Sequence, residues 1–163
     1  RRNAHAPGSG RREFAMSSTE GRVAAIAVRT EKLGPMREIE VANAALGGGI
    51  DGDIPVKITR GITLISREQW EQAMGELGAD LPWHTRRANV LVEGLPLQNL
   101  VGRVVRVGGV QIHIHGETEP CGLMDRLYDG LQFALKPEMR GGVHGEVIQA
   151  GAFSVGDTIT LLP

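Results

Sequence analysis

The chain has 163 residues with a formal net charge of −1, and its 41% apolar and 23% charged residues are typical of one globular domain rather than a disordered or collagen-like chain. The longest apolar run, residues 23–28, is far shorter than the roughly 20 residues that cross a bilayer, which excludes a transmembrane helix. The single cysteine, Cys121, excludes an intrachain disulfide and favours a reducing, cytoplasmic location.

Residues 1–20 are predicted to be a disordered or vector-derived leader, and residues 21–163 a single domain. Residues 1–15 hold four arginines and one glutamate without the apolar segment of a secretory signal, so Met16 is interpreted as the natural start. Because residues 1–15 contribute +3, the remaining chain carries −4. An acidic domain binds polyanions poorly, so neither nucleic acid nor an anionic membrane is expected as a partner.

Short runs rich in valine and isoleucine, separated by glycines, begin at Gly21. Their spacing predicts a mainly β, barrel-like fold. Gly108-Gly109 suits a two-residue hairpin turn, and after it Val110, Ile112 and Ile114 alternate with polar residues, as on a half-buried strand. About eight strands are expected, over residues 21–29, 37–41, 62–66, 89–93, 104–107, 110–115, 144–150 and 158–162.

One clear helix is expected after residue 66. Ser66 can cap its first turn, with Gln69 at the capping-box position, and Gly78 suits its end. A second, weaker helix is expected over residues 123–134. The apolar stripe of the first helix consists of Ile65, Trp70, Met74 and Leu77.

Cys121 lies in the segment GETEPCGLM, residues 116–124, between an expected strand and the weaker helix. Pro120 restricts the backbone before the thiol, and Gly122 removes side-chain bulk after it. A helix that begins beyond Cys121 would stabilise a thiolate through its free N–H groups and its dipole. The alternative is that Cys121 is a small buried hydrophobe, and both interpretations stay open.

His113, His115 and His144 are candidate bases for this thiol, because histidines on strands or turns can approach it across the mouth of a barrel. A Cys/His dyad for acyl transfer would also need an orienting group, for which Asn89 can be nominated, and an oxyanion hole. One cysteine with scattered histidines lacks the paired CxxC or HxxxH spacing of a zinc site, so zinc is not expected.

Two arginine segments can complement an anion: Arg86-Arg87-Ala88-Asn89 and Arg140-Gly141-Gly142. A guanidinium binds oxyanions bidentately, and neighbouring glycines let backbone N–H groups approach the same ligand. The alternative is that these are solvated surface arginines. Residues 47–53, GGGIDGD, lack the Lys-Ser/Thr of a Walker loop and the GxGxxG spacing, so tight turns explain them better.

Seven segments carry a family resemblance through their order and spacing: residues 49–53 (GIDGD), 63–70 (TLISREQW), 87–95 (RANVLVEGL), 100–102, Pro120-Cys121, 140–142 (RGG) and 151–162 (GAFSVGDTITLL). Together they resemble the MOSC domain, named for the C-terminal domain of molybdenum cofactor sulfurases, in its small stand-alone bacterial form. The resemblance spans residues 21–163.

The resemblance implies a mostly β, barrel-like fold with few helices, and a cysteine that carries sulfane sulfur or coordinates molybdenum. By position that cysteine is Cys121. The loop after Asp53, residues 54–56, departs from the family pattern and is not expected to line the pocket. The family also brings an association with the molybdenum cofactor and, at family level, with pyridoxal phosphate. The expected binding residues around Cys121 are Arg87, Asn89, Arg140, His115, His144 and Gly122.

Three hypotheses follow. In the first, Cys121 accepts sulfur from a cysteine desulfurase as a persulfide and delivers it to a metal centre or cofactor. In the second, the chain is a molybdenum-cofactor oxidoreductase that acts on N-hydroxylated substrates, with Cys121 as the metal ligand. In the third, Cys121 is packed in the core and the domain is a non-catalytic binding module.

Overall fold

The computed structural model describes residues 18–54 and 57–163, so residues 1–17 of the predicted leader lie outside the described residues. The first strand begins at Glu20, inside the range predicted for that leader. The strands are β1 (Glu20–Arg29), β2 (Met36–Ile39), β3 (Val41–Ala44), β4 (Ile62–Ser66), β5 (Val90–Glu93), β6 (Val104–Val107), β7 (Val110–Glu117), β8 (Val143–Gln149), β9 (Gly151–Ser154) and β10 (Thr158–Leu161).

Seven of these strands close into a barrel, which confirms the predicted mainly β, barrel-like fold. The order around it is β10-β6-β7-β8-β4-β5-β1, and β10 pairs with β1 to close the ring. β4 and β5 pair in parallel, whereas the other pairs around the barrel are antiparallel. β2 extends the sheet beyond β1, and β3 forms a separate two-stranded sheet with β9.

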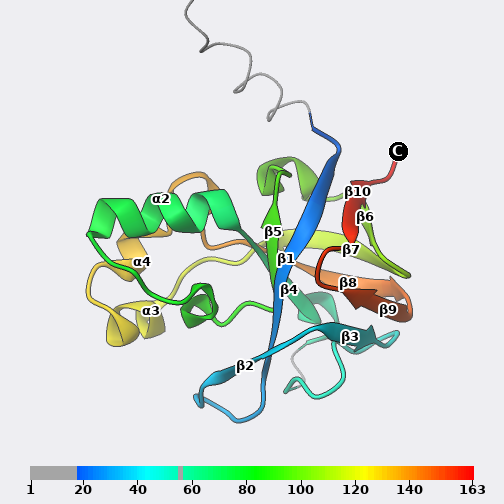
Figure 1. Ribbon diagram of the computed structural model, residues 1–163, viewed down its shortest axis with the longest axis horizontal. Coiled ribbons are helices and arrows are strands. Elements are labelled where there is room, and N and C mark those ends of the chain that lie inside the picture. The colour runs from blue at the N-terminus through cyan, green and yellow to red at the C-terminus, as the bar shows by residue number, and fades with distance from the viewer. Residues whose placement is uncertain (1–17, 55–56) are drawn as a thin grey trace, which may run out of the picture.

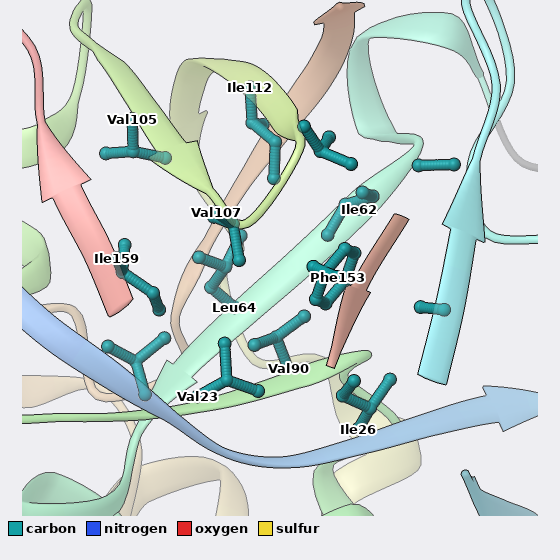
Figure 2. Close-up of a cluster of buried hydrophobic side chains, with 14 of the residues drawn as sticks. Val23, Ile26, Ile62, Leu64, Val90, Val105, Val107, Ile112, Phe153 and Ile159 are labelled. Atoms are coloured by element: carbon teal, nitrogen blue, oxygen red, sulfur yellow. The ribbon is translucent and has the colours of Figure 1, made fainter. Parts of the chain in front are cut away.

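The barrel interior is filled with aliphatic side chains (Figure 2). On β7 the predicted alternation is confirmed: Val110, Ile112 and Ile114 are buried, while His113 and His115 point to the outer face. Phe153 of β9 closes one side of the interior with the labelled residues of Figure 2 around it. The interior is therefore a packed core, and any ligand site must lie outside it or at its ends.

Three helices lie together on one side of the barrel (Figure 1): α2 (Arg67–Leu77), α3 (Gly122–Leu127) and α4 (Leu131–Ala134). They cover the outer face of β4 and β5 through a second apolar cluster that includes Ile65, Trp70 and Leu91. The predicted caps of α2 are confirmed, since Ser66 accepts a hydrogen bond from the Gln69 N–H and Gly78 ends the helix in the left-handed region.

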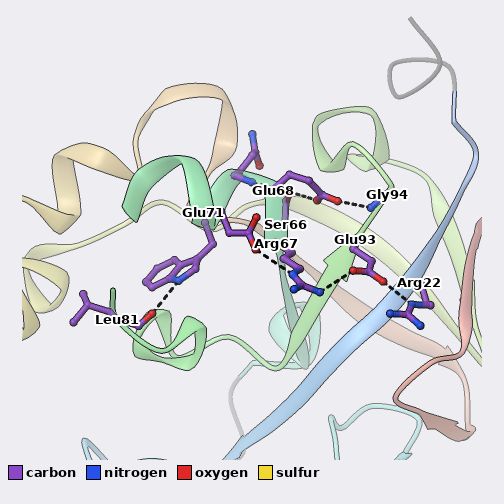
Figure 3. Close-up of polar contacts among 10 residues, drawn as sticks. Arg22, Ser66, Arg67, Glu68, Glu71, Leu81, Glu93 and Gly94 are labelled. Carbon is purple, nitrogen blue, oxygen red and sulfur yellow. Dashed lines mark hydrogen bonds and ion pairs between the residues drawn. The ribbon is translucent and has the colours of Figure 1, made fainter. Parts of the chain in front are cut away.

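A chain of polar contacts ties α2 to the barrel (Figure 3). Glu93 at the end of β5 lies between Arg22 of β1 and Arg67 of α2, with a distance of 3.0 Å from the Arg67 Nη1 atom. Arg67 also contacts Glu71, one turn further along α2. Glu68 accepts a hydrogen bond from the Gly94 N–H. These contacts fix the helix layer against the strands that lead to the site.

Two regions differ from the sequence predictions. The run 37–41 is divided into β2 and β3 around Glu40, and β9 was not predicted, so ten strands lie within the described residues instead of about eight. The weaker helix is interrupted between α3 and α4, because Tyr128 is extended and Gly130 has a φ of 87°. In residues 18–54 and 57–163, no helix combines the length and apolar character needed to cross a bilayer.

Four short 3-10 turns also lie within the described part of the chain: η1 (Ile58–Arg60), η2 (Trp83–Arg86), η3 (Leu97–Leu100) and η4 (Pro137–Met139). Two of them carry arginines that reach the site described next.

Candidate functional site

Cys121 is exposed, so the interpretation of this residue as a small buried hydrophobe is wrong. It stands just before α3, at the edge of a pocket of about 280 Å³. We call this the arginine pocket. It is lined by Arg29, Arg60, Arg86, Arg87, Thr63, Thr118, Glu119, Cys121, Leu123 and Met124.

Arg86 is the most deeply buried cation of the arginine pocket. Its Nε donates to the Gly141 carbonyl at 2.9 Å, and its Nη2 donates to the Thr118 carbonyl at 2.9 Å. Burial lowers the pKa of Arg86 to about 10, although negative charge at Cys121 acts to raise it and Arg60 to lower it further.

Arg87, Arg60 and Arg29 come from three separate parts of the chain. Arg87 follows η2 with a φ of 65°, and its Nη1 donates to the Gly34 carbonyl. Burial and the neighbouring Arg29 lower the pKa of Arg87, while Asp53 acts against them. Within residues 18–54 and 57–163, Arg60, Arg86 and Arg87 form no ion pair with a carboxylate. The pocket is therefore cationic in a domain whose net charge is negative.

Arg29 is held by the glycine-rich loop through Asp53. The two carboxylate oxygens of Asp53 accept hydrogen bonds from the Arg29 Nε at 3.1 Å and Nη2 at 2.8 Å, and the Arg29 backbone N–H also donates to Oδ1 at 2.7 Å. The loop was expected to be only a set of tight turns. Asp53 does not line the arginine pocket, but it orients one of the guanidiniums that do.

Asn89 is fully buried and does not line the arginine pocket. Its Nδ2 donates to the Asp53 carboxylate and to the Ala27 carbonyl, each at 3.2 Å, and its Oδ1 accepts from the Thr63 N–H at 3.0 Å. A buried amide needs such partners. Asn89 thus joins β1, β4 and the Asp53 loop beneath the pocket instead of presenting its side chain to a ligand.

Arg140 does not line the arginine pocket either. Its guanidinium is buried and donates to both carboxylate oxygens of Glu76 on α2, at 2.7 and 3.1 Å, and to the Ala134 carbonyl. These bonds lower the pKa of Glu76 and fix the position of the Arg140 side chain. Arg140 was predicted to contact an anion, but in the structure its guanidinium is bonded to Glu76 and to the Ala134 carbonyl instead.

Gly141 and Gly142 support the site through their backbones. Their N–H groups donate to the Leu135 and Met139 carbonyls, so these N–H groups are engaged within the chain. The Gly141 carbonyl accepts from Arg86, and the Gly142 carbonyl accepts from the Thr118 N–H at 2.8 Å. The glycines allow this segment to pass close beneath the loop that carries Cys121, because a Cβ on Gly141 would lie 2.6 Å from the Thr118 carbonyl oxygen.

None of the predicted histidines lines the arginine pocket. The Nδ1 of His144 is 3.1 Å from the Thr118 hydroxyl, so His144 reaches the pocket through one intervening side chain. Burial, Arg60 and His115 lower the pKa of His144. His115 instead contacts Glu146. Gly122 is exposed beside Cys121 and also lies outside the lining.

The structure thus places Arg87 with Cys121, as predicted, and adds three guanidiniums that the sequence analysis did not assign to the site. Arg86 stands next to Arg87 in one of the two arginine segments, so the sequence indicated this segment but Arg87 was chosen as the binding residue. Arg29 and Arg60 carried no local signal. Together these groups can bind an anion next to a thiol that is open to attack or ligation.

Comparisons with known proteins agree with this fold. The family model of the MOSC domain matches residues 51–160. The YuaD protein from Bacillus subtilis has a similar structure, with a TM-score of 0.72 at 19% identity, covering 87% of this chain and 95% of that one.

Two further solved structures are similar. YiiM from Geobacillus stearothermophilus has a TM-score of 0.67 at 16% identity, covering 88% of this chain and 75% of its own. YiiM from Escherichia coli has a TM-score of 0.67 at 18% identity, covering 87% and 70%. No curated protein matches the sequence at a significant level.

Proposed function

The chain belongs to the MOSC domain family, and on that premise we propose that it is a sulfur carrier, in which Cys121 accepts sulfane sulfur as a persulfide and passes it to an anionic metal-cofactor acceptor. The observation that carries the proposal is the exposed Cys121 at the edge of a pocket with four arginines. The thiolate is the nucleophilic form of cysteine, and guanidiniums favour negative charge on the thiolate, the persulfide and the acceptor alike.

The first transfer is a thiol exchange. The Cys121 thiolate attacks the outer sulfur of a persulfide on a cysteine desulfurase. The S–S bond of the donor breaks, its thiolate leaves with the electron pair, and a new S–S bond forms on Cys121. The exchange needs no external oxidant or reductant, and delivery to a thiolate on the acceptor is the same exchange with Cys121 as the donor.

A docking surface for the sulfur donor is proposed beside the thiol. Leu127, Tyr128 and Phe133 lie on and between α3 and α4, the elements that follow Cys121, and Phe133 is 77% exposed. Exposed apolar and aromatic side chains in one region are typical of protein interfaces. A desulfurase that covers them would bring its persulfide to the arginine pocket.

Sulfur loading tests the proposal. Incubation with a cysteine desulfurase and L-cysteine should add the mass of one sulfur atom to the intact protein, and a thiol reductant should remove it. Cys121→Ser should gain nothing. The proposal fails if the native chain gains no sulfur, or if Cys121→Ser gains as much.

The docking surface has its own control. Phe133→Ser should slow loading from the desulfurase but leave loading from inorganic polysulfide unchanged, because polysulfide needs no protein contact. Equal rates from the desulfurase in both chains would remove this surface from the proposal and leave the carrier chemistry intact.

A second candidate is a molybdenum-cofactor oxidoreductase that acts on N-hydroxylated substrates. The number of arginines favours it, since one persulfide does not require four guanidiniums, whereas a pterin cofactor carries a doubly charged phosphate. The residues fit that group: Cys121 supplies a soft ligand for the metal, and Arg60, Arg86 and Arg87 are free of carboxylate partners among the described residues. When bound, the cofactor would supply the redox chemistry.

Metal analysis separates the two candidates. Protein from a molybdenum-competent host should retain molybdenum in proportion to protein if the second candidate is right, and Cys121→Ser should lose it. Sulfur loading without retained molybdenum favours the carrier. Pyridoxal phosphate does not fit, because no lysine is among the described residues that line the arginine pocket, and this cofactor is held as a Schiff base to lysine.

A further inference from the structure

Two histidines and a glutamate lie together on the outer face of the barrel, and none of them lines the arginine pocket. His113 and His115 belong to β7, and Glu146 belongs to β8. His113 and Glu146 are direct partners in the antiparallel register of the two strands. We call these three residues the His/Glu cluster.

A β-bulge brings the third side chain of the cluster into place. Ile114 is paired with Gly145 and Gly116 with His144, so His115 is the extra residue on β7. Bulges of this kind re-aim a side chain relative to a regular ladder. The rings of His113 and His115 have centroids 4.5 Å apart and are tilted by 59°.

The distances within the cluster are close to those of a metal site. The ligand atoms of the three side chains all lie within 4.8 Å of one another, and the His115 Nε2 is 3.1 Å from the Glu146 Oε2. Ligand atoms at the usual zinc distances lie about 3.3 Å apart around a tetrahedral ion. Small rotations of side chains that are exposed or half-buried therefore suffice to close the set around one ion.

The donor types select the class of metal. Two imidazoles and one carboxylate suit zinc and neighbouring transition metals, whereas magnesium and calcium prefer sites made of oxygen atoms. Three protein ligands also leave one tetrahedral position to water. We propose that the His/Glu cluster binds one divalent transition-metal ion, Zn²⁺ or a congener such as Co²⁺, independently of Cys121 and the arginine pocket.

The sequence does not predict a zinc site, because one cysteine with scattered histidines lacks the usual paired spacing. In the structure Cys121 is not part of the cluster, and the carboxylate of Glu146 is the third candidate ligand. The competing explanation is an ordinary ion pair between His115 and Glu146, in which His113 has no part. His113 is therefore the residue that distinguishes a metal site from an ion pair.

Co²⁺ binding to the full chain tests the site. A Cys121→Ser background removes thiol ligation, and binding is followed by visible absorption and by competition with Zn²⁺. The parent should bind one ion with the spectrum of a tetrahedral or five-coordinate site. His113→Ala should weaken binding by more than about tenfold, a loss that even an outer partner of a metal ligand can cause.

His84→Ala is the matched control, because His84 also faces a carboxylate, Glu38 at 3.7 Å, but belongs to no group of metal-ligating side chains among the described residues. It should bind as the parent does, and metal-free melting temperatures of all variants verify folding. The proposal is overturned if the parent shows no saturable binding, if His113→Ala binds as tightly as the parent, or if His84→Ala loses binding to the same extent. Because the background lacks the thiol, these results do not depend on the sulfur-carrier proposal.

Discussion

Replacement of Gly142 by alanine should destabilise the domain strongly. Gly142 has a φ of 99°, a conformation that costs a residue with a Cβ about 1–3 kcal/mol. A Cβ there would also lie 2.2 Å from the Leu64 carbonyl oxygen and 2.8 Å from the Ile65 Cγ2 atom. β4 is a strand of the closed barrel wall and cannot move away from the added Cβ. Overpacking at this position therefore adds about 1–3 kcal/mol to the destabilisation. We expect Gly142→Ala to lower the free energy of unfolding by about 4 kcal/mol.

Gly156 provides the matched control. Its φ of 94° is nearly the same, but nothing lies within 4 Å of an added Cβ. Gly156→Ala should therefore show only the conformational cost, about 1–3 kcal/mol. Urea unfolding followed by tryptophan fluorescence measures both. If the two variants differ by less than about 0.5 kcal/mol, the close approach of Gly142 to β4 does not limit stability and the reasoning is refuted.

Three further predictions concern charge. Arg60→Gln should slow alkylation of the thiol by anionic iodoacetate about twofold more than alkylation by neutral iodoacetamide. Arg106→Gln, which removes another exposed arginine outside the pocket, should leave the ratio of the two rates unchanged, and an unchanged ratio in Arg60→Gln would argue against a cationic pocket. Asp53→Asn should lower the free energy of unfolding by about 2 kcal/mol, because it leaves the largely buried guanidinium of Arg29 without its carboxylate partner. Chemical denaturation measures this, and an unchanged denaturation midpoint would contradict the prediction. Arg22 and Arg67 lower the pKa of Glu93 below 4.5. The contribution of Glu93 to stability is therefore present above pH 4.5 and is lost as the pH falls through the lowered pKa. Glu93→Gln should reduce the fall in melting temperature on acidification, and identical pH profiles of the two proteins would refute this contribution.

Local signals in the sequence were sufficient for part of the fold. Ser66 and Gly78 bound α2 as predicted, and Gly108-Gly109 joins β6 to β7, because caps and tight turns depend on neighbouring residues. β9 was missed because its partner β3 lies far away in the sequence. A short strand that pairs only through a distant contact leaves little local pattern.

The site was predictable to the extent that its chemistry lies in one segment. Cys121 stands out by its Gly/Pro frame, and its side chain is exposed in the structure. Asn89 and Arg140 are polar residues in motif positions, yet their side chains are taken up by buried hydrogen bonds. The sequence alone does not distinguish a polar side chain that forms hydrogen bonds to buried neighbouring groups from one that faces a ligand.

Closure of the barrel through β1 and β10 has a consequence for biosynthesis. Glu20 pairs with Thr160, and Arg22 with Thr158, so the first and last strands of the domain are neighbours. The ring cannot close on the ribosome until β10 has left the exit tunnel, and until then the nascent β1 keeps one edge without its final partner. Such distant pairing makes folding slow, and a chaperone that shields this edge would be expected to raise the yield of native protein.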